Sequence, residues 1–252
     1  MTGDTLIAVT AIGAGVGLLS GMFGKGGSAV ATPLLAAIGI PAVIAVASPL
    51  PATIPTTIAA AAAYWRDGQL DRRVVGITVA AGIPATIVGA ITTRWVNGNI
   101  LVLITDLVLA TLGLVVLIEG GRNPHAEGRP LCPPVRSIAI IAVTVGFASG
   151  LLANSGGALL APLYLTVLHL PIKRTFASSL TAATALAIPA TVVHTILGHI
   201  DWAVVGMFAV ASVPLAIMGA HLALHTSSSR LQRAYGVVLF GLGTSFAVAR
   251  LV

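Results

Sequence analysis

Long apolar runs fill almost the whole chain and restrict it to folding in a membrane. In the first half they cover about residues 5–23, 29–38, 42–65, 74–93 and 100–118. In the second half they cover about residues 137–153, 158–169, 175–197, 203–221 and 234–249. Most are close to the roughly 17–25 residues that a helix needs to cross a bilayer, and only 8% of all residues are charged. We therefore predict an all-α polytopic membrane protein.

Two glycine-rich breaks interrupt these runs. Residues 20–28 read SGMFGKGGS and lead to Pro33, and residues 149–157 read SGLLANSGG and lead to Pro162. Hydrocarbon offers no hydrogen bonds, so every backbone group that a break leaves unpaired is costly. Such breaks occur where they line a polar cavity, and in duplicated membrane proteins they mark the binding site. We interpret the two breaks as the substrate site of a transporter.

The breaks belong to a tandem duplication. With an offset of 129, Gly17, Ser20, Gly21, Gly27, Ala29 and Pro33 match Gly146, Ser149, Gly150, Gly156, Ala158 and Pro162. One inserted residue raises the offset to 130, and Pro41, Ala47, Ser48, Gly68, Asp71, Gly76, Pro84 and Gly89 then match Pro171, Ala177, Ser178, Gly198, Asp201, Gly206, Pro214 and Gly219. We predict a first repeat at 1–118, a polar linker at 119–136 and a second repeat at 137–252. Each repeat has about five helical segments.

The distribution of positive charge predicts the orientation of the repeats. With five segments in each half, one face collects 11 of the 13 lysine and arginine residues, and the other keeps Arg94 and Arg250. With four crossings in each half, the split becomes 7 to 6. Short cytoplasmic loops carry an excess of lysine and arginine, which favours the first arrangement. We therefore predict inverted repeats, with both termini outside and the linker in the cytoplasm.

The run at 29–38 is too short to cross a membrane. Its ten residues extend about 15 Å as a helix, half of a hydrocarbon core of about 30 Å. A half-length helix after a glycine loop is typical of a re-entrant element whose tip stops near mid-membrane. We expect two such tips to enter from opposite faces and to meet near the centre, and full crossings are the alternative.

The first tip consists of Gly24, Lys25, Gly26, Gly27 and Ser28. Lys25 carries the first charge after Asp4 and lies inside apolar sequence, where a lysine needs an anionic or water-filled destination. The glycines let backbone N–H groups turn toward a ligand. Ser28 is expected to cap the following helix, whose positive dipole end attracts anions. In the alternative, the glycines permit tight helix packing and Lys25 reaches the cytoplasmic surface.

Neutral donors are expected to complete the substrate site. The second tip supplies Asn154, Ser155, Gly156 and Gly157. The polar openings of the helices at 42–65 and 175–197 supply Ser48, Thr53, Ser178, Ser179 and Thr181. Serine and threonine hydroxyls also serve ordinary helix packing in membranes, which is the alternative for each of them.

The remaining polar residues have separate interpretations. Asp71 and Asp201 precede helices, and we expect each to cap the first turn. Asp106 lies inside an apolar run and is a candidate for proton coupling, with a shallow acid at the outer face as the alternative. His221 and His225 share a helix face, but no carboxylate or cysteine accompanies them. We expect no metal and no cofactor.

Several other classes of protein are disfavoured. The 13 lysine and arginine residues are scattered through short loops, which suits membrane orientation better than binding to nucleic acid. An intramembrane enzyme would need a catalytic cluster such as His-Glu-x-x-His or Gly-x-Ser-x-Gly, and the sequence contains neither motif. Cys132 is the single cysteine and excludes an internal disulfide.

Together the motifs resemble those of the TauE/SafE sulfite exporter family. They are two glycine-rich loops leading to a proline, each followed by a helix with an Ala-Ser pair and by a G-x-[IL]-D turn. The resemblance covers about residues 13–118 and 142–249. It implies a transporter of the bacterial cytoplasmic (inner) membrane for sulfur-containing anions such as sulfite, thiosulfate or organosulfonates. The family's glycine loops correspond to Gly24–Ser28 and Asn154–Gly157.

We expect alternating access, in which one repeat rocks against the other. The expected partners are a small anionic substrate and the lipid bilayer, and not nucleic acid. Proton coupling and a homo-oligomer are left open. The alternatives are a passive anion channel, a transporter of another small organic anion and an assembly protein without a ligand.

Overall fold

The computed structural model describes residues 3–24, 28–97 and 133–251, together with residues 100, 101, 103, 104, 107, 111, 114, 115 and 118. Every regular element in these ranges is a helix. The helices of the first half are α1 (Gly3–Phe23), α2 (Ser28–Ala37), α3 (Ala42–Ala47), α4 (Pro49–Arg66), α5 (Arg72–Thr92) and the short 3-10 helix η1 (Thr93–Trp95). Those of the second half are α7 (Val135–Leu151), α8 (Gly157–Thr166), α9 (Ile172–Ile196), α10 (Trp202–His225) and α11 (Ser228–Leu251).

Five stretches of the described helices are long and apolar enough to cross a membrane. They are Asp4–Phe23, Ala42–Arg66, Arg72–Trp95, Ile172–Ile196 and Trp202–His225. By contrast, α2 and α8 have 10 residues each, which gives them a length of about 15 Å. The all-α, multi-pass membrane fold predicted from the sequence is confirmed, and so is the half-length helix after the first glycine break. Most of the predicted run at 100–118 and of the linker lies outside the described residues.

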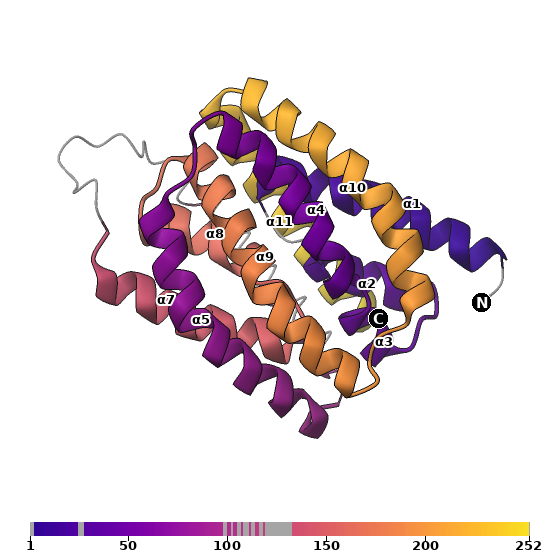
Figure 1. Cartoon of the computed structure of the whole chain (residues 1–252). Coiled ribbons are helices and arrows are strands. Elements are labelled where there is room, and N and C mark those ends of the chain that lie inside the picture. Colours follow the sequence, from indigo (N-terminus) through magenta and orange to yellow (C-terminus); the bar gives the residue numbers. More distant parts are fainter. Residues whose placement is uncertain are drawn as a thin grey trace.

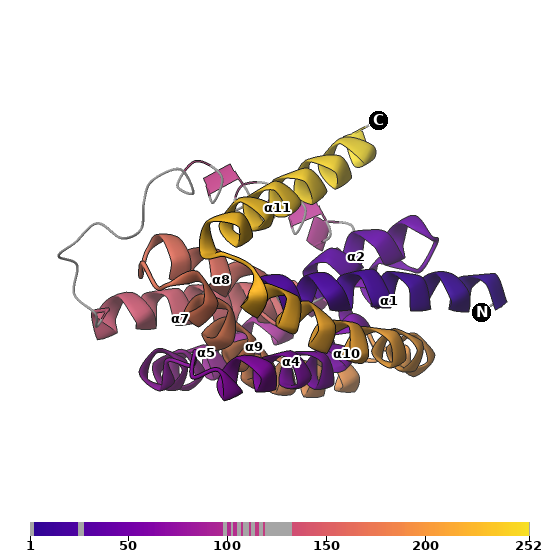
Figure 2. The ribbon, with the colours of Figure 1, turned by 90° about the horizontal axis from the view of Figure 1, so that it is seen from above.

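Two antiparallel helices, α4 and α9, form the centre of one layer. Trp65 Nε1 donates to Thr181 Oγ1 at 2.9 Å, and Thr57 Oγ1 shares a hydrogen bond of 2.7 Å with Thr184 Oγ1. Residue numbers rise along α4 while their partners' numbers fall along α9, so the two helices run in opposite directions. α5 lies beside α9, and α10 lies beside α4 (Figure 1). Seen from above, α1, α2, α7 and α8 form a second layer, and α11 crosses outside it (Figure 2).

At one end of the bundle, α4, α5 and α9 are joined by side-chain contacts. There the end of α4 meets the start of α9 through Trp65 and Thr181, and the start of α5 meets α9 through Asp71 and Ser178. The residues that give this end its charge are Arg66, Arg72, Arg73, Lys173 and Arg174. We call it the arginine-rich end.

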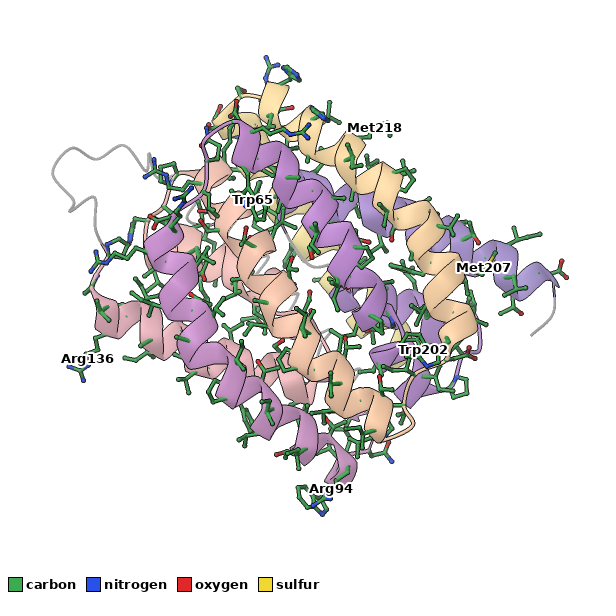
Figure 3. All side chains as sticks on the ribbon, viewed as in Figure 1. Trp65, Arg94, Arg136, Trp202, Met207 and Met218 are labelled. Atoms are coloured by element: carbon green, nitrogen blue, oxygen red, sulfur yellow. The ribbon has the colours of Figure 1, made fainter. Side chains whose placement is uncertain are left out.

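The opposite end is formed by the starts of α4 and α10 and the ends of α5 and α7. Asp201 N donates to Ser48 Oγ at 2.9 Å, and Thr93 Oγ1 donates to the Leu151 carbonyl at 2.9 Å. Arg94 follows Thr93, and we call this side the Arg94 end. Figure 3 shows Trp65 and Arg94 toward opposite edges of the molecule.

α1 packs along α10 with the two backbones in contact. A Cβ atom on Gly17 would lie 2.3 Å from the Ser212 carbonyl oxygen, and one on Gly21 would lie 2.0 Å from that of Ala216. Real Cβ atoms do not approach so closely, so only glycine fits at these positions. Lipid gives helices no hydrophobic reason to associate, and small residues instead permit the close packing that holds them together. The α5–α7 pair is built in the same way, around residues such as Gly150.

The predicted caps at the starts of α5 and α10 are confirmed. Asp71 Oδ1 accepts from Val74 N at 3.0 Å, and Asp201 Oδ1 accepts from Ala203 N at 2.9 Å. Each bond satisfies a backbone N–H that the first helical turn leaves free. At the start of α4, Pro49 supplies no N–H, which suits the first position of a helix.

Replacing Gly21 by alanine tests the close α1–α10 contact. The added Cβ meets the Ala216 backbone, so we expect the melting temperature in detergent to fall, in line with a cost of about 1–3 kcal/mol for overpacking. The matched control is Gly15→Ala in the same helix, because a Cβ there has no neighbour within 4 Å. We expect that variant to melt at or slightly above the wild-type temperature. Equal melting temperatures for the two variants would contradict the packing described.

Candidate binding site at the glycine breaks

In the first glycine break, the structure shows how Gly24 is held. This residue is buried and has a φ of +64°, a conformation that glycine adopts without strain. Its carbonyl oxygen accepts a hydrogen bond of 2.7 Å from Ser179 Oγ on α9. A Cβ on Gly24 would lie 2.5 Å from Phe176 Cα, so the break is pressed against α9. Lys25, Gly26 and Gly27 lie outside the described residues, and so does the side chain of Ser28, which begins α2.

The second break is held by its own polar groups. Ser149 Oγ donates to the Asn154 carbonyl, and Gly156 N donates to Asn154 Oδ1 at 3.4 Å. Gly156, with a φ of +79°, is the N-cap of α8, which begins at Gly157. Asn154, Ser155, Gly156 and Gly157 are all buried. The break is therefore enclosed by protein.

Gly24 of the first break and Gly156 of the second lie against the central helix α9, at different levels. Gly24 contacts Phe176, and Gly156 lies near Leu186, where a Cβ would be 3.3 Å from Leu186 Cδ1. The two contact points are 186 − 176 = 10 residues apart, or about 15 Å along the helix axis. The predicted meeting of two complete tips involves residues 25–27 and stays a prediction.

Ser48 and Ser178 occupy corresponding places at the two ends of the bundle. Ser48 Oγ accepts from Asp201 N at 2.9 Å, and Ser178 Oγ accepts from Asp71 N at 3.1 Å. Each serine therefore holds the residue that caps a long helix of the other half. Since a serine hydroxyl can donate as well as accept, these bonds leave its proton available to a second partner.

Thr53 and Thr181 are engaged in different ways. Thr53 Oγ1 donates within its own helix to the Pro49 carbonyl at 3.0 Å and is buried. Thr181 Oγ1 donates to the Ala177 carbonyl at 2.8 Å and accepts from Trp65 Nε1. The structure thus joins Ser179 to Gly24 directly, while Thr53 and Thr181 form no hydrogen bond with the described residues of either break.

Two further residues, which the sequence did not assign to the site, support the helices that lead into the breaks. Tyr64 Oη donates to the Gly21 carbonyl at 2.9 Å, and His194 Nε2 bonds the Gly150 carbonyl at 3.1 Å. Tyr64 and His194 are 130 residues apart, and Gly21 and Gly150 are 129 apart, as in the duplication. The matched offsets were the only sequence signal that could have paired them.

His194 also contacts His199, which lies in the loop before α10. Their Nδ1 atoms are 3.1 Å apart. Because His194 Nε2 faces a carbonyl, it must donate its proton, and Nδ1 of neutral His194 is then the acceptor. His199 Nδ1 accordingly donates. This pairing fixes the tautomers of both rings while they are neutral.

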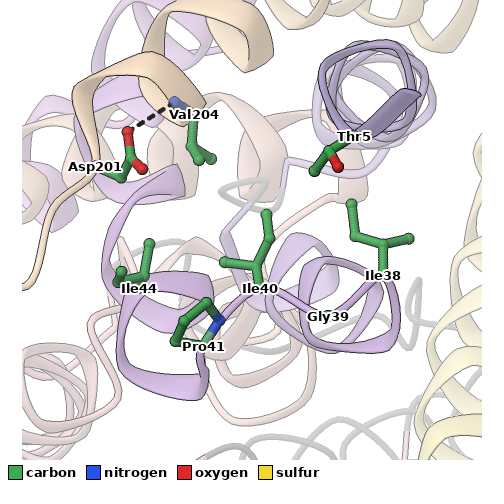
Figure 4. A pocket seen from close by; sticks show the side chains of 8 residues that line it. All are labelled: Thr5, Ile38, Gly39, Ile40, Pro41, Ile44, Asp201 and Val204. Atoms are coloured by element: carbon green, nitrogen blue, oxygen red, sulfur yellow. Dashed lines mark hydrogen bonds between the residues drawn. The ribbon is translucent and has the colours of Figure 1, made fainter. Parts of the chain in front are cut away.

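Two hollows open near opposite ends of the bundle. One of about 500 Å³ is lined by Trp65, Gly68, Leu70 and Arg72 at the arginine-rich end. The other, of about 220 Å³, is lined by Thr5, Ile38, Gly39, Ile40, Pro41, Ile44, Asp201 and Val204 (Figure 4). It lies at the Arg94 end, where the chain leaves α2, and Asp201 accepts from Val204 N on its wall.

The remaining candidate residues from the sequence are Asp106, His221 and His225. Asp106 lies outside the described residues. His221 and His225 are exposed on α10. Across the described ranges, no three histidine, cysteine or acidic residues are grouped so that they could hold a metal ion.

These features define a multi-pass helical membrane protein in which Gly24 of the first break and residues 154–157 of the second are buried among the helices. The sequence model of the family described as "Sulfite exporter TauE/SafE" matches residues 9–246. The chain therefore belongs to the sulfite exporter TauE/SafE family, and it is a membrane transporter.

Curated relatives agree with this assignment. A "probable membrane transporter protein" of Xylella fastidiosa (strain 9a5c) is 28% identical over 96% of this chain and 95% of its own. The "probable membrane transporter protein YjnA" of Bacillus subtilis (strain 168) is 24% identical over 90% of this chain and 93% of its own. No solved structure matches the chain.

The burial of His199 predicts a pH dependence of stability. Burial lowers the pKa of the His199 imidazole below its ordinary value of 6.5. The unfolded chain therefore binds this proton more readily than the folded protein does. The free energy of unfolding keeps its full value above about pH 6.5 and decreases as the pH falls through that value. We expect the melting temperature in detergent to decrease between about pH 7.5 and pH 5.5, and His199→Asn to flatten the decrease. The exposed His225→Asn control should keep the wild-type slope, and an unchanged slope in His199→Asn would contradict this origin.

Proposed function

We propose that this transporter is a secondary carrier of small sulfur-containing anions, such as sulfite, thiosulfate or an organosulfonate. The observation that carries the proposal is that Gly24 of the first break and Gly156 of the second are both buried against the same central helix, α9. A break that faced lipid would leave backbone polar groups unpaired, so enclosed breaks are the natural place for a polar ligand. The family name points to sulfite.

Alternating access between inverted repeats is the proposed mechanism. It is supported by the opposite directions of α4 and α9 and by the reciprocal bonds from Ser48 to Asp201 and from Ser178 to Asp71. The hollows at the two ends are suitable entrances from the two sides of the membrane. The arginine-rich end would face the cytoplasm, because positive charge accumulates there.

In the proposed site, Lys25 offsets the charge of the anion, and neutral donors bind its oxygens. The candidate donors are the backbone N–H groups of Gly24, Gly26, Gly27, Gly156 and Gly157, and the side chains of Ser28, Ser48, Thr53, Asn154, Ser155, Ser178, Ser179 and Thr181. Because Ser48 and Ser178 lie at opposite ends of the bundle, a small anion meets only part of this set at any one position. Charge-assisted hydrogen bonds of this kind are the stronger ones in proteins. Asp106 is the candidate for coupling transport to protons.

Removing the Lys25 charge tests the proposed site. In proteoliposomes, we expect Lys25→Ala to raise the KM for sulfite or thiosulfate about tenfold or more, because the anion loses the counter-charge that the proposal assigns to it. The matched control is Lys173→Ala, which removes the only other lysine. Lys173 Nζ donates to the Leu224 carbonyl at the arginine-rich end, so that variant should keep the wild-type KM. An unchanged KM in Lys25→Ala would exclude Lys25 as the partner of the anion.

Counterflow measurements separate a carrier from a passive anion channel. A carrier exchanges labelled for unlabelled anion faster when substrate is present on the opposite side, whereas a channel shows no such trans-stimulation. Running the assay with sulfite, thiosulfate, sulfate and a carboxylate also tests the alternative of another small organic anion. Repeating it with and without a pH gradient tests proton coupling.

The single native cysteine tests the predicted orientation. Cys132 lies in the 119–136 linker, which we place in the cytoplasm. In intact cells, a membrane-impermeant maleimide should therefore leave Cys132 unlabelled, and it should label Asn97→Cys in a Cys132→Ser background. Asn97 follows η1 at the Arg94 end and is exposed. Labelling of Cys132 but not of Asn97→Cys would reverse the orientation.

A further inference from the structure

Three tyrosines are fully buried in the described part of the chain, and their hydroxyl groups differ in one respect. Tyr64 Oη donates to the Gly21 carbonyl at 2.9 Å, and Tyr164 Oη shares a hydrogen bond of 2.6 Å with Thr78 Oγ1. Tyr235 on α11 is equally buried, with 0% of its surface exposed, but among the described residues its Oη has no hydrogen-bond partner. A buried hydroxyl without a partner destabilises a protein relative to phenylalanine at the same place.

Tyr235 lies beside the first glycine break. Its ring stacks on Phe23 at a centroid distance of 5.6 Å and meets Phe176 edge to face at 5.3 Å. Phe23 directly precedes Gly24, and Phe176 is the residue against which Gly24 is pressed. Ser179, one turn further along α9, donates to the Gly24 carbonyl. The unpartnered phenol therefore borders the same break as a serine hydroxyl from another helix.

The phenol cannot relieve its lack of a partner by rotation alone. A buried threonine without a partner, such as Thr86 on α5, can turn about χ1 toward the carbonyl four residues earlier. The oxygen of Tyr235 is fixed at the end of a ring held by Phe23 and Phe176, and only its hydrogen can turn. Within the part of the chain that the structure describes, this hydroxyl has no acceptor. A bound ligand would supply one.

We propose that the Tyr235 hydroxyl is a hydrogen-bond donor to the oxyanion that this transporter carries, bound beside the Phe23–Gly24 segment. The assignment rests on the proposed transport of sulfur oxyanions. A neutral phenol donor suits this place because oxyanion oxygens are strong acceptors, and hydrogen bonds in a site that excludes water are stronger than in solution. The aromatic rings of Phe23 and Phe176 would keep the donor dry and oriented until the anion arrives.

The three buried tyrosines supply a matched set of variants for the test. Tyr235→Phe, Tyr64→Phe and Tyr164→Phe each remove one oxygen from a buried ring, and among the described residues only the oxygen of Tyr235 lacks a partner. Each variant and the wild type would be purified in detergent. The melting temperature without ligand and the dissociation constant for thiosulfate and for sulfite would be measured, followed by uptake in proteoliposomes.

We expect Tyr235→Phe to melt at or above the wild-type temperature, because no bond is lost, and to bind the anion about tenfold more weakly or worse. Tyr164→Phe should behave in the opposite way, with a lower melting temperature and a dissociation constant within about twofold of the wild-type value. Tyr64→Phe should likewise melt at a lower temperature. A raised KM for uptake in Tyr235→Phe, with a wild-type KM in Tyr164→Phe, would further support Tyr235 as a ligand of the transported anion.

Three outcomes would overturn the assignment, and they can be told apart. If wild-type protein binds and carries thiosulfate or sulfite while Tyr235→Phe retains the wild-type dissociation constant, Tyr235 is not a ligand although the proposed function stands. If wild-type protein neither binds nor carries a sulfur oxyanion, the proposed function itself is wrong, and the role of Tyr235 fails with it. A lower melting temperature for Tyr235→Phe with unchanged binding would show that the hydroxyl has a structural partner.

Discussion

The exclusion of water from the bilayer core governs this structure. Wherever a helix is interrupted within hydrocarbon, the backbone groups it frees must find partners inside the protein. The chain meets this demand with side chains. Ser179, Tyr64 and His194 come from other helices and bond the carbonyls of Gly24, Gly21 and Gly150, whereas Ser149 bonds the carbonyl of Asn154 within the same break. An interrupted helix that is supported in this way can present polar groups in the membrane interior, which an anion requires.

The two halves solve the same structural problem with different chemistry. At positions 130 residues apart, Tyr64 and His194 bond equivalent glycine carbonyls, one through a phenol hydroxyl and the other through an imidazole nitrogen. Thr56 shares a hydrogen bond of 2.8 Å with Ser212, whereas at the related positions Leu186 packs against Gly82. The halves therefore keep a common framework while their polar groups differ. Such differences allow the sides of one substrate site to contribute unequally.

The sequence predicted those features that depend on local signals. The half-length of α2 followed from the spacing of breaks, and the caps at Asp71 and Asp201 followed from their place before apolar runs. The pairing of Ser179 with Gly24 joins residues 155 positions apart, and that of Tyr64 with Gly21 depends on how α1 crosses α4. No periodicity in the sequence specifies such contacts, because they depend on the register of packed helices. Tyr235 was missed for the same reason, since its significance lies in a partner that is missing from the packed core. The roles of Lys25 and Asp106 stay predictions.

The most direct measurement is the position of a bound anion. Crystals grown with selenite, the selenium analogue of sulfite, would reveal the ion through the anomalous scattering of selenium. The account predicts a peak enclosed among the helices beside Gly24 and α9, within hydrogen-bond distance of Ser179 or Tyr235. Selenium found only among the exposed arginines, with none near either glycine break, would contradict it.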